Sequence, residues 1–212
     1  TSCCPSWAML AKKYFPDMID EVSQELTPMV ATARTIKKEH PNAKVVFIGP
    51  CAAKKLEAMR RTVRSDVDFV VTFEELQGMF DAKGVDWKDI PEGEPLFRAS
   101  ADGRGFAVSG GVAQAVVHAV KRIDPDREVK VVNAEGLQNC KKMLQMAKLG
   151  KYNGYLLEGM ACPGGCVAGA GTIQTIKKAS AALDKMKKEA AFEEASDSKY
   201  QSRLESLEKL DL

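Results

Sequence analysis

The sequence predicts an α/β protein built of parallel-sheet lobes flanked by helices, with a helical carboxy-terminal tail. Two observations predict this fold. Short β-branched runs alternate with longer segments of helical periodicity along most of the 212 residues, which is the pattern of strand–helix–strand units with parallel strands. A hydrophobic fraction of 45% can also supply a substantial core at this length. We expect residues 1–175 to form the body, as two α/β lobes, and residues 176–212 to form an extension.

Four short runs rich in Val, Ile, Phe and Leu are predicted to be the strands. They are Lys44–Gly49, Asp68–Thr72, Val129–Asn133 and Tyr155–Glu158. In the first run the apolar residues are consecutive rather than alternating, which is typical of a strand covered on both faces. We therefore expect Lys44–Gly49 to be a buried strand.

Helical periodicity marks the segments around these strands. The predicted helices are Ala8–Tyr14, Asp17–Leu26, Val30–His40, Phe73–Phe80, Gly111–Arg122 and Gly136–Leu149. Pro16 separates the first two, because proline breaks the helical hydrogen-bond pattern. The stretch Lys83–Gly105 is rich in Gly, Pro and Asp and is predicted to be an irregular loop, while Ile176–Leu212 is charged and predicted to be a helical tail that packs on the body or on a partner.

The charge and hydropathy of the chain exclude two classes of protein. Thirty-one Lys and Arg against 29 Asp and Glu give a net charge of +2 without long blocks of one sign, so a nucleic-acid-binding tail is excluded. The longest apolar runs, such as Val45–Ile48, are far shorter than the roughly 20 residues that a membrane span needs. The sequence begins at Thr1 rather than at Met, so we expect upstream residues to be missing.

Six cysteines are too few for the disulfide scaffold of a small secreted domain, and several of them are placed for metal binding. They are Cys3, Cys4, Cys51, Cys140, Cys162 and Cys166. Cys51 and Cys162 each follow a predicted strand within a few residues. Because ligands collect at the carboxyl ends of parallel strands, we expect these two thiols to share one site.

The residues around these cysteines are suited to an anionic cluster. Glycine and proline in the tight loops at 49–51 and 161–166 allow backbone N–H groups to turn toward sulfur. Four thiolates, from Cys4, Cys51, Cys162 and Cys166, would supply the ligands of a 4Fe-4S cluster. The Cys-x-x-x-Cys spacing of the last pair is wider than that of zinc knuckles and weighs against structural zinc.

Three stretches of the sequence resemble the signature motifs of the FeFe (iron-only) hydrogenases in order and approximate separation. They are TSCCPSW at 1–7, GPCAAKKLEA at 49–58 and EGMACPGGCVAGAG at 158–171. The connecting sequence is similar as well, so the resemblance covers roughly residues 1 to 175. Three motifs in order are a far more specific signal than any one of them.

The resemblance implies an H-cluster, in which a 4Fe-4S cubane is joined to a two-iron unit carrying CO, CN and a bridging azadithiolate. On the matching positions, Cys4, Cys51, Cys162 and Cys166 would bind the cubane, and Cys166 would also bridge to the two-iron unit. Cys3 resembles the proton-relay cysteine of the family. A thiol has a reference pKa near 8.5 and can pass protons at neutral pH when it lies within hydrogen-bond reach of a donor and an acceptor.

Further residues match the family around this cofactor. Ser23 resembles a relay serine on the helix that follows, Lys54 resembles a lysine that donates a charge-assisted hydrogen bond to a cyanide ligand, and Pro50 and Met160 resemble residues that line the pocket. Three positions depart from the common family pattern and are expected near the two-iron unit, which suggests a divergent subgroup. They are Gly49, Met29 and the ending of the third motif, where Ala170 stands with Thr172.

The family also implies partners and a setting. The segment that precedes the first motif in the family and the amino-terminal ferredoxin-like domains are both absent from this sequence, so electrons are expected to come from a ferredoxin or another electron-transfer domain. H2 and protons would be the substrates, and separate maturation proteins would supply the two-iron unit. A cytoplasmic, anaerobic location is expected, with no nucleic-acid partner.

Three functions remain open at this point. The first is a hydrogenase catalytic domain that interconverts protons, electrons and H2. The second is a hydrogen-sensing regulatory member with the same cofactor and slow turnover. The third resembles the hydrogenase-like proteins of iron–sulfur assembly, which hold a 4Fe-4S cluster without the two-iron unit. Cys3 and Lys54 favour the first function, because both are suited to a two-iron pocket.

Overall fold

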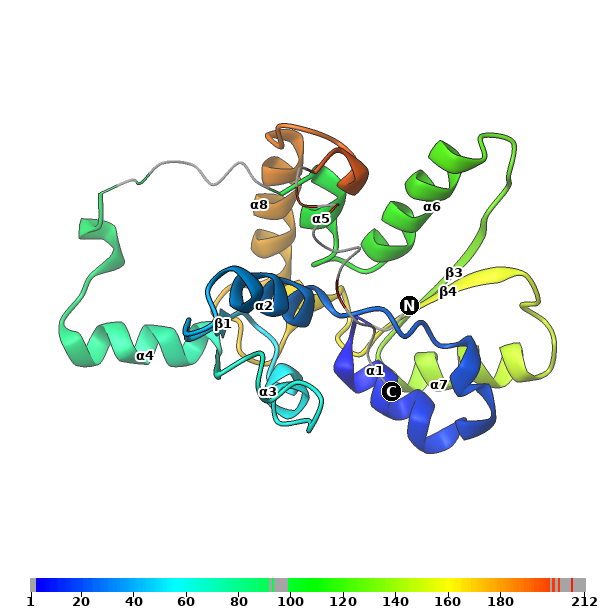
Figure 1. Ribbon diagram of the computed structural model, residues 1–212, viewed down its shortest axis with the longest axis horizontal. Coiled ribbons are helices and arrows are strands. Elements are labelled where there is room, and N and C mark those ends of the chain that lie inside the picture. The colour runs from blue at the N-terminus through cyan, green and yellow to red at the C-terminus, as the bar shows by residue number, and fades with distance from the viewer. Residues whose placement is uncertain are drawn as a thin grey trace.

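The computed structural model describes residues 3–91, 93, 99–198, 200, 202 and 207. Within these residues the chain forms two separate parallel sheets of two strands each, with helices around them. Figure 1 shows the two sheets in different halves of an elongated molecule, with α4 extending away at one end. The predicted α/β class and parallel strands are confirmed.

The elements follow one another in the order that the alternating sequence pattern predicts. The strands are β1 (Val46–Ile48), β2 (Phe69–Val71), β3 (Lys130–Glu135) and β4 (Tyr155–Met160). The helices are α1 (Pro5–Tyr14), α2 (Pro28–Glu39), α3 (Ala53–Ala58), α4 (Phe73–Lys83), α5 (Ala101–Gly105), α6 (Gly111–Ile123), α7 (Leu137–Lys148) and α8 (Ile176–Lys188). Short 3₁₀ helices are η1 (Pro16–Glu21), η2 (Trp87–Asp89), η3 (Cys166–Ala168) and η4 (Ala195–Asp197).

The first sheet pairs β1 with β2 so that Val46 lies opposite Phe69 and Ile48 opposite Val71. One face of this sheet packs against a core cluster in which α2 takes part. The buried members of that cluster are Met29, Val30, Ala33, Val63 and Val67, with Phe47 and Val70 of the strands packed against them. α2 begins where Thr27 accepts a hydrogen bond from the N–H of Val30 at 3.5 Å, an arrangement typical of a helix N-cap.

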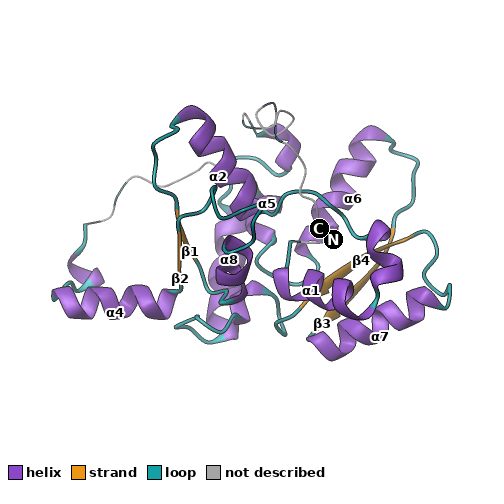
Figure 2. Cartoon of the chain, turned by 60° about the horizontal axis from the view of Figure 1, so that its bottom comes forward, coloured by secondary structure: helices purple, strands orange, loops and turns teal. Residues whose placement is uncertain are grey.

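The second sheet pairs β3 with β4 and is covered on both faces. A core cluster joins it to α1 and α7 and contains Trp7, Leu10, Ala11, Phe15, Val22, Ala134, Cys140, Met143 and Leu144. On the other face α6 lies against β4 (Figure 2). Gly159 of β4 lies so close to the indole of Trp7 that a Cβ there would be 2.6 Å from Cδ2. The start of α1 is therefore held directly on the end of β4.

The expectation of a buried first strand is wrong. Val46 and Ile48 are 48% and 47% exposed and Phe69 is 62% exposed. Phe47 packs on the core cluster that includes α2, whereas Val46 and Ile48 lie on the opposite, more exposed face. A consecutive apolar run therefore does not establish two covered faces in a sheet of two strands.

The predicted helix Asp17–Leu26 is also wrong. The chain forms only the 3₁₀ helix Pro16–Glu21, and Val22 then adopts an extended conformation with φ −82° and ψ 127°. This conformation places Val22, 7% exposed, in the core cluster with Trp7. Tertiary packing of Val22 outweighs the helical pattern here, and the residue before Pro28 is biased toward extended structure as well.

Two other predictions need correction within the described residues. The expected loop Lys83–Gly105 contains η2 and the short helix α5, which starts where Ser100 accepts a hydrogen bond from the N–H of Gly103 at 2.9 Å. α5 packs on α8, and such packing compensates for its two glycines.

The expected helical tail Ile176–Leu212 is helical over α8, which packs on the body as predicted. Between 189 and 198 it has only the 3₁₀ turn η4. Residues 92, 94–98, 199, 201, 203–206 and 208–212 lie outside the described part.

Among the helices of the described chain, no helix combines the length and the apolar character that crossing a bilayer requires.

Candidate metal-cluster site

Five of the six cysteines line one pocket. The pocket has a volume of about 200 Å³, and its thiols belong to Cys3, Cys4, Cys51, Cys162 and Cys166. They come from three places that are far apart in sequence: the start of α1, the loop after β1 and the loop after β4. The shared site expected for Cys51 and Cys162 at the strand ends is therefore present in the structure.

The first pair of thiols is placed by the start of a helix. Cys4 is the N-cap residue of α1, in an extended conformation, and Pro5 occupies the first helical position. Proline suits this position because its fixed φ matches the helix and its missing N–H would have no partner there. The adjacent Cys3 and Cys4 thus lie at the end of α1 where backbone N–H groups favour negative charge.

The second segment is held by backbone hydrogen bonds to both neighbouring segments. The N–H of Gly49 donates to the carbonyl of Val71 at 3.1 Å, and the N–H of Gly171 donates to the carbonyl of Pro50 at 2.9 Å. A Cβ on Gly169 would be 2.4 Å from that same carbonyl. Pro50 is not among the residues that line the cysteine pocket, so its contribution in the described structure is this contact between the Cys51 and Cys166 loops.

The third segment is a tight turn that needs glycine. Gly164 and Gly165 have φ values of +90° and +95°, which residues with a side chain rarely adopt. A Cβ on Gly165 would also be 2.6 Å from the backbone nitrogen of Ser109. The turn closes through the N–H of Gly165, which donates to the carbonyl of Cys162 at 3.0 Å, and this closure brings Cys162 and Cys166 to the same pocket.

A buried ion pair lies at the pocket. The ammonium of Lys54 is 2.6 Å from the carboxylate of Glu57 and 3.4 Å from the carbonyl of Cys3. Lys54 is 8% exposed and Glu57 is 1% exposed. Removing either partner would leave the other as an unpaired buried charge, which is costly, so the pair keeps a cationic donor in the pocket wall.

Burial shifts the pKa of three pocket thiols, Cys3, Cys162 and Cys166, upward. Burial, followed by the charge of Cys4, raises the pKa of Cys3 to about 11. Burial, followed by the charges of Cys51 and Cys3, raises the pKa of Cys166 to about 12. Metal ligands must be thiolates, so metal binding by Cys162 or Cys166 would be accompanied by release of a proton.

The spacing of the thiols also bears on the kind of metal. Within the described residues, no three His, Cys, Asp or Glu side chains approach closely enough to hold one metal ion. The thiols instead surround a common cavity, together with the buried Met160. Thiols from three segments around one cavity could hold a cluster of several metal atoms bound by Cys thiolates.

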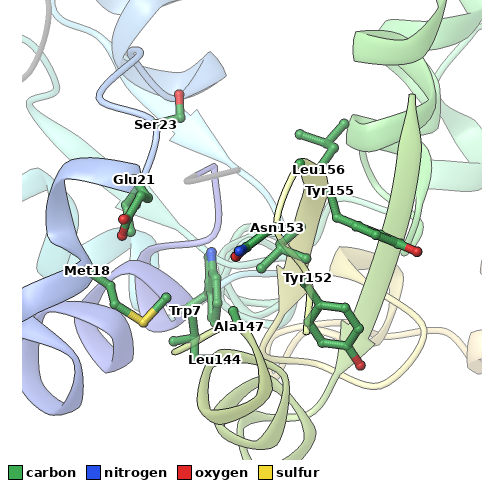
Figure 3. A pocket seen from close by; sticks show the side chains of 13 residues that line it. Trp7, Met18, Glu21, Ser23, Leu144, Ala147, Tyr152, Asn153, Tyr155 and Leu156 are labelled. Atoms are coloured by element: carbon green, nitrogen blue, oxygen red, sulfur yellow. The ribbon is translucent and has the colours of Figure 1, made fainter. Parts of the chain in front are cut away.

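Ser23 lies in a different pocket from the cysteines. It follows η1 rather than lying on a helix, so the expected helical placement is wrong. This pocket has a volume of about 370 Å³ and lies between η1, α7 and β4. Figure 3 shows Glu21 and Ser23 on one side of it, with Tyr152, Asn153 and Tyr155 on the other. The hydroxyl of Ser23 accepts a hydrogen bond from the N–H of Glu25 at 3.4 Å.

The three positions that depart from the family pattern are not all near the cysteines. Ala170 lines the cysteine pocket. Met29 is instead buried in the core cluster beside α2, and Gly49 lies against the ring of Phe47, where a Cβ would be 2.9 Å from Cε1. Of the three, therefore, only Ala170 lines this pocket.

Sequence reasoning missed Glu57 as the partner of Lys54. The signal was present, because residues three apart face each other on a helix and α3 carries both. Sequence reasoning also gave no sign of the contacts of Cys140, which is 0% exposed and packs in the core cluster beside β3 and β4. The thiol of Cys140 donates to the carbonyls of Ala134 and Met160 at 3.4 and 3.5 Å.

Comparison with known proteins identifies the family. The model described as "Iron only hydrogenase large subunit, C-terminal domain" matches residues 1–170, and the chain belongs to this family. It is 32% identical over 212 aligned positions to the periplasmic Fe hydrogenase large subunit of Nitratidesulfovibrio vulgaris, an alignment covering 81% of this chain and 50% of that protein.

Two other similarities indicate the range of the family. A probable cytosolic Fe-S cluster assembly factor of Aedes aegypti is 26% identical, over 88% of this chain and 50% of that protein. The structure of a variant of the FeFe-hydrogenase HydA1 from Chlamydomonas reinhardtii superposes with a TM-score of 0.75 at 22% identity, covering 95% of this chain and 69% of that one. The chain spans about half the length of these two curated relatives. It is a hydrogenase-like domain of a family of iron–sulfur proteins.

Proposed function

We propose that this chain is the cofactor-binding part of an FeFe hydrogenase and takes part in reversible H2 oxidation and proton reduction. The observation that carries the proposal is the composition of one pocket. It contains four candidate ligand thiols together with two groups that a plain 4Fe-4S site does not need, the thiol of Cys3 and the ammonium of Lys54.

Cys4, Cys51, Cys162 and Cys166 are the proposed ligands of a 4Fe-4S cubane. Cys166 would in addition hold a two-iron unit with CO, CN and azadithiolate ligands. When bound, this cofactor would supply the redox equivalents and the open iron site for H2 chemistry. The residues present fit it, because sulfur donors from three segments surround one cavity.

Lys54 and Glu57 act together in this proposal. The ammonium of Lys54, held by Glu57 at 2.6 Å, would donate a charge-assisted hydrogen bond to an anionic ligand such as cyanide. Lys54 lines the cysteine pocket, and its contact with the buried Glu57 restrains the side chain there. Glu57 is thus the positioning residue for Lys54.

Cys3 is the proposed proton-transfer group. It lines the pocket next to the ligand Cys4 without being required as a fifth ligand, so its thiol can hold a proton at Sγ beside the site. Met160, 1% exposed, lines the pocket with an apolar side chain.

Several predictions stay predictions. A relay role for Ser23 would require proton transfer between two pockets. The resemblance alone implies electron supply by a ferredoxin, delivery of the two-iron unit by maturation proteins and a cytoplasmic, anaerobic location. The relatives named above include one periplasmic and one cytosolic protein by name.

A second candidate is an iron–sulfur assembly or scaffold protein with a 4Fe-4S cluster and no two-iron unit. The similarity to the Aedes aegypti protein over 88% of the chain favours it. A hydrogen-sensing member with slow turnover would use the same cofactor as the hydrogenase and would differ from it in rate.

The test is H2 evolution from a reduced dye by protein loaded with iron, sulfide and a synthetic two-iron precursor. The proposal predicts turnover that the Cys3→Ala variant loses almost completely while it retains the cluster spectrum. Cys140→Ala is the matched control, because this thiol lies outside the pocket lining, and it should keep its turnover per loaded cluster. Equal turnover in Cys3→Ala and wild type would contradict the role of Cys3. A protein that holds the cubane but retains no two-iron unit would favour the scaffold function, and a protein that retains both with little H2 evolution would favour the sensing function.

A further inference from the structure

Glu158 is a buried acidic residue that the proposed chemistry does not use. It lies in β4 with 0% exposure. One carboxylate oxygen accepts from the N–H of Gly110 at 2.7 Å and the other from the N–H of Ala113 at 2.6 Å. Gly110 is the N-cap of α6 and offers no side chain for capping. Glu158 therefore caps α6 from a neighbouring strand and ties the loop before α6 to β4.

The loop that Glu158 holds, residues 107–110, is in direct contact with the cysteine turn. The N–H of Ser109 donates to the carbonyl of Gly164 at 3.2 Å, and the N–H of Val167 donates to the carbonyl of Ala107 at 3.1 Å. A Cβ on Gly165 would be 2.6 Å from the nitrogen of Ser109 and 2.8 Å from the oxygen of Ala107. The turn is thus packed on this loop, backbone against backbone.

A second carboxylate holds the same turn from β3. Glu135 lies opposite Met160 at the end of the sheet, and its carboxylate accepts from the N–H of Gly164 at 2.7 Å. Glu135 is exposed, whereas Glu158 is buried. The buried contact is therefore the one whose loss cannot be replaced by bulk water.

We propose that Glu158 is a positioning residue for the turn that carries Cys162 and Cys166, acting through the 107–110 loop. This inference rests on the proposed function only in taking these two cysteines as cluster ligands, and it does not require H2 turnover. The chemistry demands a carboxylate at this position, because two backbone donors need two acceptor oxygens. A glutamine offers one oxygen and would turn an NH2 group toward the other donor.

The test is hydrogen–deuterium exchange on protein reconstituted with iron and sulfide alone, compared among wild type, Glu158→Gln and Asp102→Asn. Asp102, 7% exposed, also loses a buried contact in its variant, since it lies 2.9 Å from His118, and it does not line the cysteine pocket. In Glu158→Gln, amides in 107–113 and in 163–167 should exchange about tenfold faster together, because one buried hydrogen bond is lost.

The electron paramagnetic resonance spectrum of the reduced cubane supplies a second readout, which supports the proposal only together with faster exchange at 163–167, because the charge of Glu158 also acts on Cys3. The spectrum should shift in Glu158→Gln and stay as in wild type in Asp102→Asn, whose 163–167 amides should also remain protected. Faster exchange confined to 107–113 would overturn the proposal and leave Glu158 as a helix cap only.

If Glu158→Gln does not fold, Glu158→Asp provides the same test. The aspartate side chain is shorter by one methylene, so its carboxylate cannot reach both N–H groups. Amides in 107–113 and in 163–167 should again exchange faster, by a smaller factor. Unchanged exchange at 163–167 would overturn the proposal. Failure of the two-iron unit to bind would count against the proposed function without affecting this readout.

Discussion

The two sheets have the same connectivity and the same number of strands, yet they are stabilised in different ways. The β3–β4 sheet is covered on both faces, and the last three residues of β4 are all buried. The β1–β2 sheet is covered by α2 on one face, and its other face exposes Val46, Ile48 and Phe69. Each sheet delivers a cysteine segment to the pocket, but only the β3–β4 sheet does so with buried carboxylate support from Glu158.

This difference indicates that the two halves contribute to the site in different ways. The β3–β4 half, with α1 packed on it through Trp7 and Gly159, forms a fixed wall that carries three of the four proposed ligands. The β1–β2 half contributes Cys51 and the Lys54–Glu57 pair and is held by exposed ion pairs such as Lys55–Glu75 at 2.6 Å. We therefore expect substitutions in the β3–β4 half to have the larger effects.

The largest expected effect is loss of the cluster itself. Both Cys51→Ala and Cys162→Ala should fail to hold a full cubane after reconstitution, because each removes one of four thiolates. Iron and sulfide analysis with visible absorption checks this, and Cys140→Ala should retain wild-type iron content. A fully loaded Cys51→Ala protein would show that the β1–β2 half supplies no ligand.

The next effect concerns core packing in the two halves. Leu144→Ala, at a residue 3% exposed in the cluster below β3–β4, should lower the free energy of unfolding by about 2–5 kcal/mol. Phe69→Ala, at a residue 62% exposed on the open face, should change it by no more than about 0.5 kcal/mol. Urea unfolding measures both, and a large loss in Phe69→Ala would indicate that this face is covered in the protein.

A pair of glycines sharpens the same comparison. Gly159→Ala would place a Cβ 2.6 Å from the indole of Trp7 and should cost about 1–3 kcal/mol through overpacking. Gly78→Ala, in α4 with no atom within 4 Å of the added Cβ, should stabilise the protein by about 0.4–1 kcal/mol. Thermal unfolding distinguishes the two signs, and a neutral Gly159→Ala would contradict the tight contact between α1 and β4.

The smallest effect is an acid sensitivity of the β1–β2 half. Hydrogen bonds from Lys55 and from the N–H of Thr72 lower the pKa of Glu75 from 4.5 to about 2, and hydrogen bonds from the N–H of Val45 and from Lys37 hold the pKa of Asp68 well below its usual range. Lowered pKa values stabilise the fold above pH 4.5, and this contribution disappears as the pH falls toward 2.

Amide exchange between pH 5 and pH 2.5, corrected for intrinsic rates, should therefore show β1, β2 and the start of α4 losing protection. In Glu75→Gln this loss should be smaller, because the titrating group is gone. Equal acid sensitivity of the variant and the wild type would show that the Glu75 contacts do not contribute.

Much of this architecture could be predicted from the sequence because it depends on local patterns. The four strands, their parallel direction and the shared rim of Cys51 and Cys162 all follow from β-branched runs and from the short distance between each strand and its cysteine. The features that were missed depend on tertiary contacts. Val22 leaves the helical pattern because it packs beside Trp7, and α5 forms from a glycine-rich stretch because it packs on α8.

The site shows the same limit. Motif positions predicted which thiols meet. The residues that support the cysteine loops from behind could not be predicted from spacing. Glu158 and Gly110 are separated by 48 residues in sequence, and nothing in the sequence of either marks the contact. Ser23 illustrates the converse, since its position in the sequence matched the family and yet it lies in a neighbouring pocket.

The most direct test of the central claim is the infrared spectrum of the protein after anaerobic reconstitution with iron and sulfide and addition of a synthetic two-iron precursor. The account predicts metal carbonyl and cyanide bands that persist after desalting and that shift in Lys54→Ala, which lacks the cationic donor. The absence of retained bands from protein whose cubane is visible by electron paramagnetic resonance would contradict the claim and would assign the pocket to a plain 4Fe-4S cluster.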